Sequence, residues 1–442
     1  MRFVSYQEIN IILPSGNKIK IRSPFFVKAK SKTGKKKRGP QGRGHHLGLE
    51  LFGFVNKIAP TLVKEVVQLA VLAPSFDIVS RLLEDKKIKL SKNQIRKLCY
   101  TLGSIEQKSK VKMTLREGES LAGKRVFITV DGGRVRSRKQ KKGPIAQEKK
   151  QHGYSTDWKE PKLFAIYVLD SKGNLNKKIP PFIDGTIDGS KEKKYESMID
   201  LLQTYLQTLE IHKAKEVILS ADGAPWIWTH VPALLKRLGV EKKKIVEVLD
   251  WTHAKQNLFP LFTDLSKKMK KKVSLSLKNA KSLLFNGEIE KLMEKVLLLS
   301  DDKAEKKMQE YFLNNKHRFQ YSSFKANKIP TGSGHIESAI RRVINLRIKS
   351  PGSFWKLKNA QAVLFLRAIL LYGRWLTFIK NYFSLLIKEF KTITVSPKKG
   401  KKTKELDIFS QTFHREHREQ NNLSQKVTRV TEEAVKALKD AA

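Results

Sequence analysis

Two short runs of β-branched and apolar residues in this chain each end in an Asp-Gly dipeptide. FITVDGG places Asp131 at the end of the first run, and VILSADGAPW places Asp222 at the end of the second. A later run of the same kind, KKIVEVLDWTH, supplies Asp250 and His253. Runs of this length and composition are typical of buried β-strands. The chain is therefore expected to build a sheet in which several strands end in acidic residues.

The order of the predicted elements indicates how this sheet is arranged. Three strands come first, in RVFITVDGG, KLFAIYVLD and KIPPFIDGTI, the third weakened by two prolines. A helix over 190–208, a fourth strand, a helix ending at Gly239 and a fifth strand follow. Consecutive strands can form a meander, and strands separated by helices are added in parallel. The predicted fold class is α/β, with the mixed five-stranded sheet of the RNase H-like fold, in which the first and fourth strands are neighbours.

Three acidic residues are candidates for a metal site. Neighbouring strands bring Asp131 and Asp222 together, and Glu337 in TGSGHIESA lies near the start of a later helix. Adjacent carboxylates repel unless a cation neutralises them, and Mg²⁺ prefers such oxygen ligands. A pair of ions can activate the attacking oxygen and stabilise the leaving one. Taken singly, each acid also fits a structural role, because Asp-Gly is a common turn and acids are favoured at helix starts.

The charge of the chain points to a polyanionic partner. Its 89 Lys and Arg against 42 Asp and Glu give a net charge of +47. An excess of this size repels itself unless a polyanion neutralises it, and nucleic acid is the usual one. A generally basic surface without such a partner is the alternative. The single cysteine, Cys99, excludes an internal disulfide and fits a reducing, intracellular compartment.

No membrane segment is expected. MRFVSYQEIN lacks the apolar core of a signal peptide. The most apolar stretch, AQAVLFLRAILLYGRWLTFI, contains Arg367 and Arg374, so it is predicted to be one buried amphipathic helix.

The N-terminal third carries the signature of a DNA-binding helix pair. Residues 47–108 are helical by periodicity, and Ser91 with Gln94 forms a capping box that starts a helix. The inward face of this helix is predicted to hold Ile95 and Leu98, and its outward face Lys92, Asn93 and Arg96. The pattern resembles a helix-turn-helix whose second helix can enter a major groove. Two packed helices without a DNA role would look the same.

Basic and aromatic residues near the acids are further candidates for DNA contact. They follow or flank the three acids in the sequence: Arg134, Arg136, Arg138, Trp226, Trp228, Arg341, Arg342 and Arg347. The first three alternate as on one face of a strand, where a basic strip would hold the scissile strand, or they form a solvated edge. The tryptophans can stack on an unpaired base or anchor the following helix in the core.

The Asp250–His253 pair has two interpretations as well. Asp250 can orient His253, or His253 can contact a phosphate when protonated. Alternatively, His253 is a packed, hydrogen-bonded core residue.

Four parts of the chain are expected. The first is a part over 1–46, made of a β-hairpin (1–28) and a basic linker (29–46), and the second is a helical helix-turn-helix domain over 47–118. A catalytic domain over 119–390 follows, with an all-α insertion at about 255–330, and then a basic tail over 391–442.

Together these motifs resemble the DDE transposases of bacterial insertion sequences. VDGG, ADGAPWIW, LDWTHAKQNL, and GSGHIESAIRRV followed by FWKLKNAQAVLFLRAILLYGRW look like the Kra-type group. The Asp-x-x-His pattern and the helical insertion are also similar to Mutator-like and hAT transposases. The resemblance implies that Asp131, Asp222 and Glu337 hold Mg²⁺ or Mn²⁺, as two ions. It makes Asp250 and His253 an accessory motif beside the site.

The implied activity is metal-dependent hydrolysis of the phosphodiester at the ends of an element, followed by attack of the new 3′-hydroxyls on target DNA. The implied partners are double-stranded DNA, as terminal inverted repeats and as target, and further copies of the chain in a homodimer or larger assembly. The implied location is cytoplasmic, at the nucleoid. The alternatives are an RNase H-like nuclease or resolvase without strand transfer, and a non-catalytic DNA-binding protein, in which loss of an acid would be expected.

Overall fold

The computed structural model describes residues 2–27, 44–144, 152–187, 196–268, 277–297, 306 and 308–391. They form two compact units. The larger unit contains the described residues of 10–21 and 51–388, and the smaller one contains 2–9, 22–27, 44–50 and 389–391. Most of the predicted linker, the start of the helix predicted at 190–208 and nearly all of the predicted tail lie outside the described residues.

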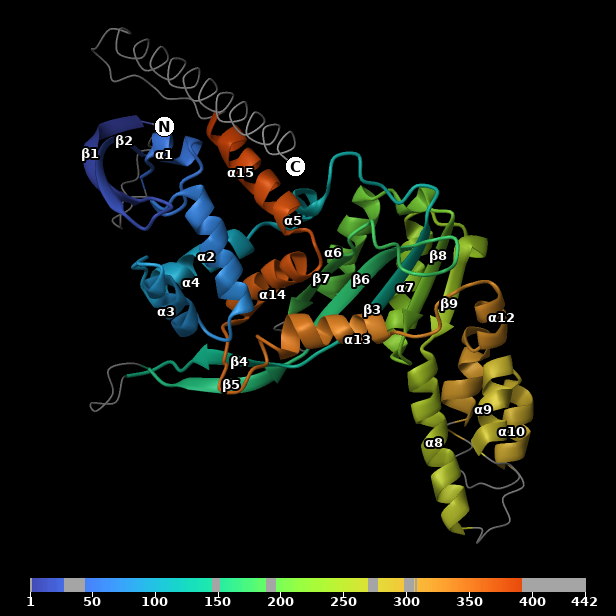
Figure 1. The fold of residues 1–442 in the computed structure, drawn as a ribbon. Coiled ribbons are helices and arrows are strands. Elements are labelled where there is room, and N and C mark those ends of the chain that lie inside the picture. The colour runs from blue at the N-terminus through green and yellow to red at the C-terminus, as the bar shows by residue number, and fades with distance from the viewer. Residues whose placement is uncertain are drawn as a thin grey trace, which may run out of the picture. The chain divides into compact units, whose positions relative to one another are not determined.

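A five-stranded mixed sheet forms the centre of the larger unit, in the order β7-β6-β3-β8-β9 (Figure 1). Its strands are β3 (Arg125–Gly132), β6 (Pro161–Leu169), β7 (Phe182–Ile187), β8 (Glu216–Ala221) and β9 (Ile245–Leu249). Neighbours among β3, β6 and β7 run antiparallel, whereas β8 and β9 continue the sheet parallel to β3. The predicted strand order, the meander and the contact between the first and fourth strands are confirmed.

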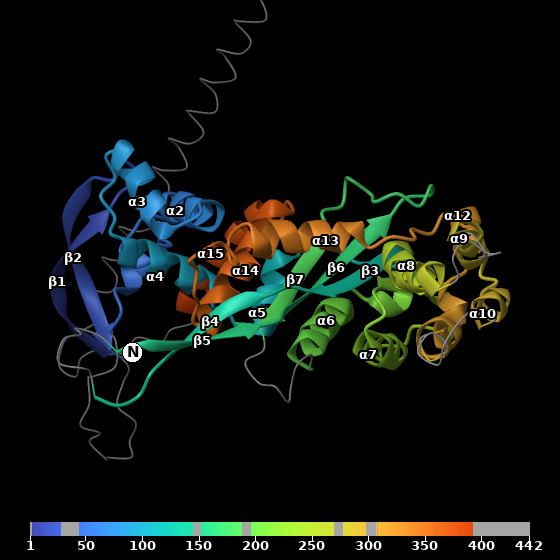
Figure 2. The ribbon, with the colours of Figure 1, turned by 90° about the horizontal axis from the view of Figure 1, so that it is seen from below.

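Helices cover both faces of this sheet (Figures 1 and 2). On one face Val126, Ile128 and Val130 of β3 share an apolar cluster with α6 (Glu196–Thr208) and α7 (Pro225–Arg237). On the other face Phe127 belongs to a cluster that includes α13 (Gly334–Ile340) and α14 (Leu357–Leu371). This alternation along β3 is what a strand buried on both faces requires.

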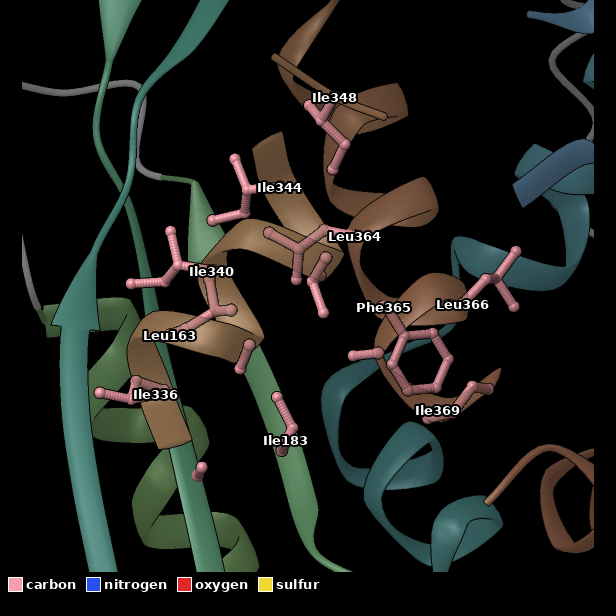
Figure 3. Close-up of a cluster of buried hydrophobic side chains, with 14 of the residues drawn as sticks. Leu163, Ile183, Ile336, Ile340, Ile344, Ile348, Leu364, Phe365, Leu366 and Ile369 are labelled. Atoms are coloured by element: carbon pink, nitrogen blue, oxygen red, sulfur yellow. The ribbon is translucent and has the colours of Figure 1, made fainter. Parts of the chain in front are cut away.

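The helix that carries Glu337 is anchored by a stripe of isoleucines. α13 continues into the π-helical turn η5 (Arg341–Asn345), and every fourth residue from Ile336 through Ile340 and Ile344 to Ile348 is buried. Figure 3 shows this stripe between the sheet, at Leu163 and Ile183, and residues of α14. Each fully buried isoleucine stabilises this packing by about 1.5–3 kcal/mol, so the helix position is firmly set.

The N-terminal elements follow the prediction. β1 (Arg2–Ile12) and β2 (Lys18–Val27) pair in a two-stranded sheet, as expected for the hairpin. Five helices come next: α1 (Leu47–Leu51), α2 (Pro60–Leu72), α3 (Phe76–Asp85), α4 (Lys92–Gly103) and α5 (Gln107–Thr114). The predicted capping box is present at Ser91, and the inward residues Ile95 and Leu98 of α4 are fully buried.

The region predicted as an all-α insertion is helical where it is described. It contains α8 (Trp251–Lys268), α9 (Leu277–Asn286), α10 (Ile289–Leu297), the π-helical η3 (Met308–Phe312), the 3₁₀-helical η4 (Leu313–Arg318) and α12 (Tyr321–Ala326). None of its described residues belongs to a strand.

Two features differ from the expectation. The polar segment after Asp131 contains two strands that pair with each other, β4 (Val135–Gln140), which only the period of two in its arginines indicated, and β5 (Tyr154–Lys159), which was not predicted. The long apolar stretch is two helices, α14 and α15 (Trp375–Lys391), separated at Gly373, where φ is +79°. α14 is also not amphipathic, because residues 362–369 are all buried.

The buried arginines of that stretch explain how charge is accommodated there. Arg367 donates to the carbonyl oxygens of Arg342 and Val71, and Arg374 forms a two-pronged ion pair with Glu119 at 2.9 Å. Among the described helices, none is both long and apolar enough to span a bilayer.

Candidate metal centre

Three aspartates line up across the carboxyl ends of three parallel strands. The last paired residues are Val130 with Ala221 and Ala221 with Leu249. The next residue in each strand is an aspartate: Asp131, Asp222 and Asp250. Since neighbouring strands lie about 4.8 Å apart and side chains alternate, the three acids extend toward the same face of the sheet. That is the face covered by α13, which carries Glu337 in its first turn.

The first two aspartates share one pocket. Asp131 and Asp222 both line an open pocket of about 650 Å³. Burial, together with the negative charges of Asp222 and Glu337, raises the pKa of Asp131 to about 6. The hydrogen bond from the Gly132 amide at 2.6 Å and the nearby His253 limit this rise. Asp131 and Asp222 therefore lie in one pocket, as their strand positions predicted. Glu337 is close enough for its charge to affect the pKa of Asp131.

Glu337 lies beside the histidine of the Asp-x-x-His pattern. His253 Nε2 is 3.8 Å from Glu337 Oε1, and the Ser333 hydroxyl is 3.4 Å from the same oxygen. One ligand atom from each of Asp250, His253 and Glu337 lies within 4.8 Å of the others. The carboxylate of Glu337 is half-exposed and that of Asp250 fully buried, so Glu337 has the more accessible oxygens.

Asp250 has a structural task that the sequence did not indicate. Its Oδ1 accepts the backbone amide of His253 at 2.8 Å, which caps α8, and its Oδ2 accepts the amide of Ser333 just before α13. Asp250 therefore holds the backbone of His253 rather than its ring, and it connects the end of β9 to the start of the Glu337 helix.

The helical insertion fixes the second acid from outside the sheet. A side chain at Gly223 would place its Cβ 2.4 Å from the ring of Tyr311, so only glycine fits against this ring. The Tyr321 hydroxyl donates to the carbonyl oxygen of Leu249 at 2.8 Å, one residue before Asp250. The Asp222 carbonyl in turn accepts the Trp228 indole at 2.8 Å. The turn after Asp222 and the end of β9 are thus held by aromatic side chains.

The two glycines after Asp131 allow other groups to approach closely. A Cβ on Gly132 would meet Glu160 at 2.6 Å, and one on Gly133 would meet Ile344 at 2.9 Å. The VDGG motif therefore provides the space in which the α13–η5 helix crosses the end of β3.

The predicted DNA-contact residues fall into separate groups. Arg134 and Trp226 line the pocket with Asp131 and Asp222. Arg341 and Arg342 are exposed on η5, beyond Glu337. Lys92, Asn93 and Arg96 are exposed on α4 and are not part of this pocket, and Lys92 pairs with Asp77 at 2.8 Å.

Arg136 and Arg138 lie on the exposed face of β4, as their period of two predicted. The guanidinium of Arg136 is 4.8 Å from the centre of the Trp158 ring, and that of Arg138 is 5.8 Å from the centre of the Tyr154 ring.

The suggestion that Arg347 contacts DNA was wrong. Only 2% of Arg347 is exposed, and its guanidinium lies 5.0 Å from Phe76 and 5.2 Å from Trp355. It packs in the core between aromatic rings, where burial lowers its pKa.

Several pocket residues were not identified from the sequence. They are Trp158, Lys159, Glu160, Lys162, Asn345 and Lys349. The Lys162 ammonium is 4.7 Å from the Trp226 ring centre and 2.8 Å from Glu160. For the first four the only signal was the basic and aromatic composition of YSTDWKEPK, which has no apolar alternation.

No protein-family model matches the chain, and no curated protein matches it. Among solved structures, a Drosophila P element transposase strand transfer complex is 13% identical, with a TM-score of 0.27, over 75% of this chain and 82% of that chain. A pre-cleavage Mos1 transpososome is 10% identical, with a TM-score of 0.17, over 68% of this chain and 84% of that chain. TM-scores this low do not establish a common fold.

Proposed function

We propose that this chain is a DDE-type DNA transposase of the bacterial insertion-sequence kind, similar to the Kra-type group. The observation that carries the proposal is the placement of the three acids. Asp131 and Asp222 end adjacent parallel strands and share one pocket, and Glu337 lies on the helix across the same face. Residues this far apart in the chain meet because of the strand order, and this order is the one we expect for an RNase H-like catalytic domain.

The donor set fits divalent metal. Two carboxylates in one pocket, one of them with a pKa raised to about 6 by burial and by like charge, form a site that a cation would stabilise. Hard oxygen donors favour Mg²⁺ or Mn²⁺. We assign Asp131, Asp222 and Glu337 as ligands, for two ions. When bound, such ions lower the pKa of the attacking water and offset charge on the scissile phosphate.

The reaction in this proposal is phosphodiester hydrolysis at the element ends, followed by transfer of the 3′-hydroxyls to target DNA. Arg134 lies in the pocket with the acids, and Arg341 and Arg342 lie exposed beyond Glu337. These guanidinium groups would hold the phosphates on either side of the cut. Asp250 keeps His253 and the Glu337 helix in place through its two backbone hydrogen bonds.

DNA recognition in this proposal belongs to the helix pair α3–α4 within a domain over 47–118. Lys92, Asn93 and Arg96 are exposed on the second helix, as entry into a major groove requires. The partners are double-stranded DNA, as inverted repeats and as target, and a second copy of the chain, because two ends must be joined. The cell's nucleoid, in the cytoplasm, is where such a protein would act.

The test compares the wild type with Asp131→Asn on DNA that carries the flanking ends of its own gene. We expect the wild type to cut or join these ends with Mg²⁺ or Mn²⁺, and Asp131→Asn to lose this activity by about 10³-fold or more while it still binds the DNA. Asp200→Asn, which changes an exposed acid on α6, is the matched control and should keep full activity.

The products separate the alternatives. Cleavage without joined products would indicate a nuclease or resolvase. Binding without any metal-dependent reaction would indicate a non-catalytic DNA-binding protein. Full activity of Asp131→Asn would refute the assignment of the three acids.

A further inference from the structure

The strand that ends at Asp131 leads directly into a two-stranded ribbon. Only Gly133 and Arg134 separate β3 from β4, and only Glu160 separates β5 from β6. The ribbon therefore starts and ends at the acid-bearing edge of the sheet and projects from it (Figures 1 and 2).

The edge of β4 that does not pair with β5 is fixed to the protein. Ser137 forms a bridge with Trp355, the Arg138 amide donates to the Trp355 carbonyl at 2.8 Å, and the Trp355 amide donates to the Arg136 carbonyl at 3.0 Å. Trp355 is buried. The ribbon is consequently held in one position relative to the acids.

The face of the ribbon that carries Arg136 is exposed and presents aromatic and cationic side chains. The register places Arg136 opposite Trp158 and Gln140 opposite Tyr154. Trp158 is 48% exposed and Tyr154 47% exposed. Exposed rings beside cationic side chains form a surface on which an unpaired base can stack.

Trp158 differs from Tyr154 in one respect that decides its role. Trp158 lines the pocket that contains Asp131 and Asp222, together with Arg134 and Lys349, whereas Tyr154 does not. The pocket volume of about 650 Å³ lies within the range of sites that enclose a small organic group. The pocket thus combines a ring for stacking, cations for phosphate and carboxylates for metal.

We propose that this pocket receives one unpaired nucleotide of the DNA end, whose base stacks on Trp158 and whose phosphate lies toward Arg134 and the acids. The guanidinium of Arg136, 4.8 Å from the ring centre, supports Trp158 from the ribbon. The base must be unpaired, because the faces of a paired base are covered by its neighbours in the duplex. This inference deepens the proposed function by naming the DNA feature that the site binds, and it rests on that function only for the reaction that follows.

The experiment measures binding alone, in EDTA, with full-length protein. The three DNA probes are a blunt duplex, the same duplex with a short thymidine overhang, and the same overhang with abasic sites. We expect Trp158→Ala to weaken binding of the thymidine overhang about 5- to 150-fold, the equivalent of about 1–3 kcal/mol of stacking. Binding of the abasic and blunt probes should not change, and Trp158→Phe should retain most of the affinity.

Tyr154→Ala is the matched control, because it removes an equally exposed ring from the same ribbon outside the pocket. It should affect all three probes alike. The proposal is overturned if Trp158→Ala leaves the thymidine overhang unaffected, or weakens all three probes equally. Thermal melts of each variant show whether it is folded, and Trp158→Phe tests the ring should the alanine variant unfold.

This result is independent of catalysis. If the Trp158 effect is found but no metal-dependent cleavage occurs, the transposase proposal fails and the nucleotide site stands. If cleavage occurs but Trp158→Ala has no effect on binding of the overhang, the nucleotide site is refuted and the transposase proposal stands.

Discussion

The buried carboxylate of Asp131 lowers the stability of the fold at neutral pH. Its carboxylate is largely buried and near two other acids, so the folded chain holds its proton up to a pH of about 6. In an unfolded chain the same carboxyl group loses its proton near its ordinary pKa of 3.8. Stability is therefore lost as the pH rises from about 4 to about 6, because over this window the folded state binds more protons than the unfolded one.

Asp131→Asn should remove this loss of stability at higher pH, because asparagine carries no charge. In EDTA at pH 8 we expect the variant to be more stable than the wild type by about 1–3 kcal/mol, a figure reduced for the partial exposure of the site. At pH 4 the two should differ little. Thermal melts at both pH values check this, and added Mg²⁺ should raise the Tm of the wild type but not of the variant. A variant that is less stable at pH 8 would contradict the explanation.

Gly223 is the residue on which the position of Asp222 depends. Gly223→Ala should push the turn away from Tyr311, because its Cβ would lie 2.4 Å from the ring. A displacement of about 1 Å at a reacting site can cost about 100-fold in rate, and metal-dependent cleavage should fall by that order. The double variant Gly223→Ala/Tyr311→Ala should recover part of the loss. Gly48→Ala is the control, because a Cβ at Gly48 would have nothing within 4 Å. If Gly48→Ala reduced cleavage as much as Gly223→Ala, the dependence of Asp222 on Gly223 would be refuted.

At the scale of helices and strands, burial determines which elements can be predicted from the sequence. The strands of the central sheet are predictable because their runs are apolar and β-branched, as in KLFAIYVLD, which forms the fully buried β6. β5 was missed because YSTDWK is largely exposed and has no apolar alternation, and β4 was indicated only by the period of two in its arginines. The break between α14 and α15 was missed because apolar residues continue on both sides of Gly373.

The α4 helix should carry sequence preference without affecting the chemistry. Asn93→Ala and Arg96→Ala should each weaken the free energy of binding to preferred DNA sites by about 1–3 kcal/mol. Binding to sequences enriched from a random DNA pool measures this loss. Metal-dependent stabilisation should be unchanged. Arg81→Ala on α3, another exposed arginine, is the control. Unaltered site preference in both α4 variants would leave α3–α4 as a packed pair without a role in recognition.

At the scale of the whole molecule, the site depends on contacts that local sequence does not encode. The strand order explains why Asp131 and Asp222 meet, and this was predictable from the alternation of strands and helices. The hydrogen bond from the Ser333 amide to Asp250 could not be predicted, because it joins a strand end to a loop far along the chain. Arg347 was misjudged because arginine is exposed by default, whereas here aromatic rings enclose it.

The net charge of +47 should give DNA binding a strong dependence on salt. If the protein contacts several phosphates, its affinity should fall about 10³-fold or more between about 50 and 200 mM salt. Arg136→Ala/Arg138→Ala should lower the slope of log K against log salt by about 1–2. Fluorescence anisotropy in EDTA measures this slope. An unchanged slope would place the ribbon outside the DNA path.

The hydrogen bonds at the ends of the helical insertion bear on how such a chain can change over evolution. The Trp251 amide donates to the Thr331 carbonyl at 2.9 Å, so the insertion leaves and rejoins the sheet at one point. A segment closed in this way behaves as a detachable module, because its length adds little to the entropy of closing the loop. Lineages could lengthen or shorten its outer part, provided that Tyr311 and Tyr321 keep their contacts with Gly223 and Leu249 beside the aspartates.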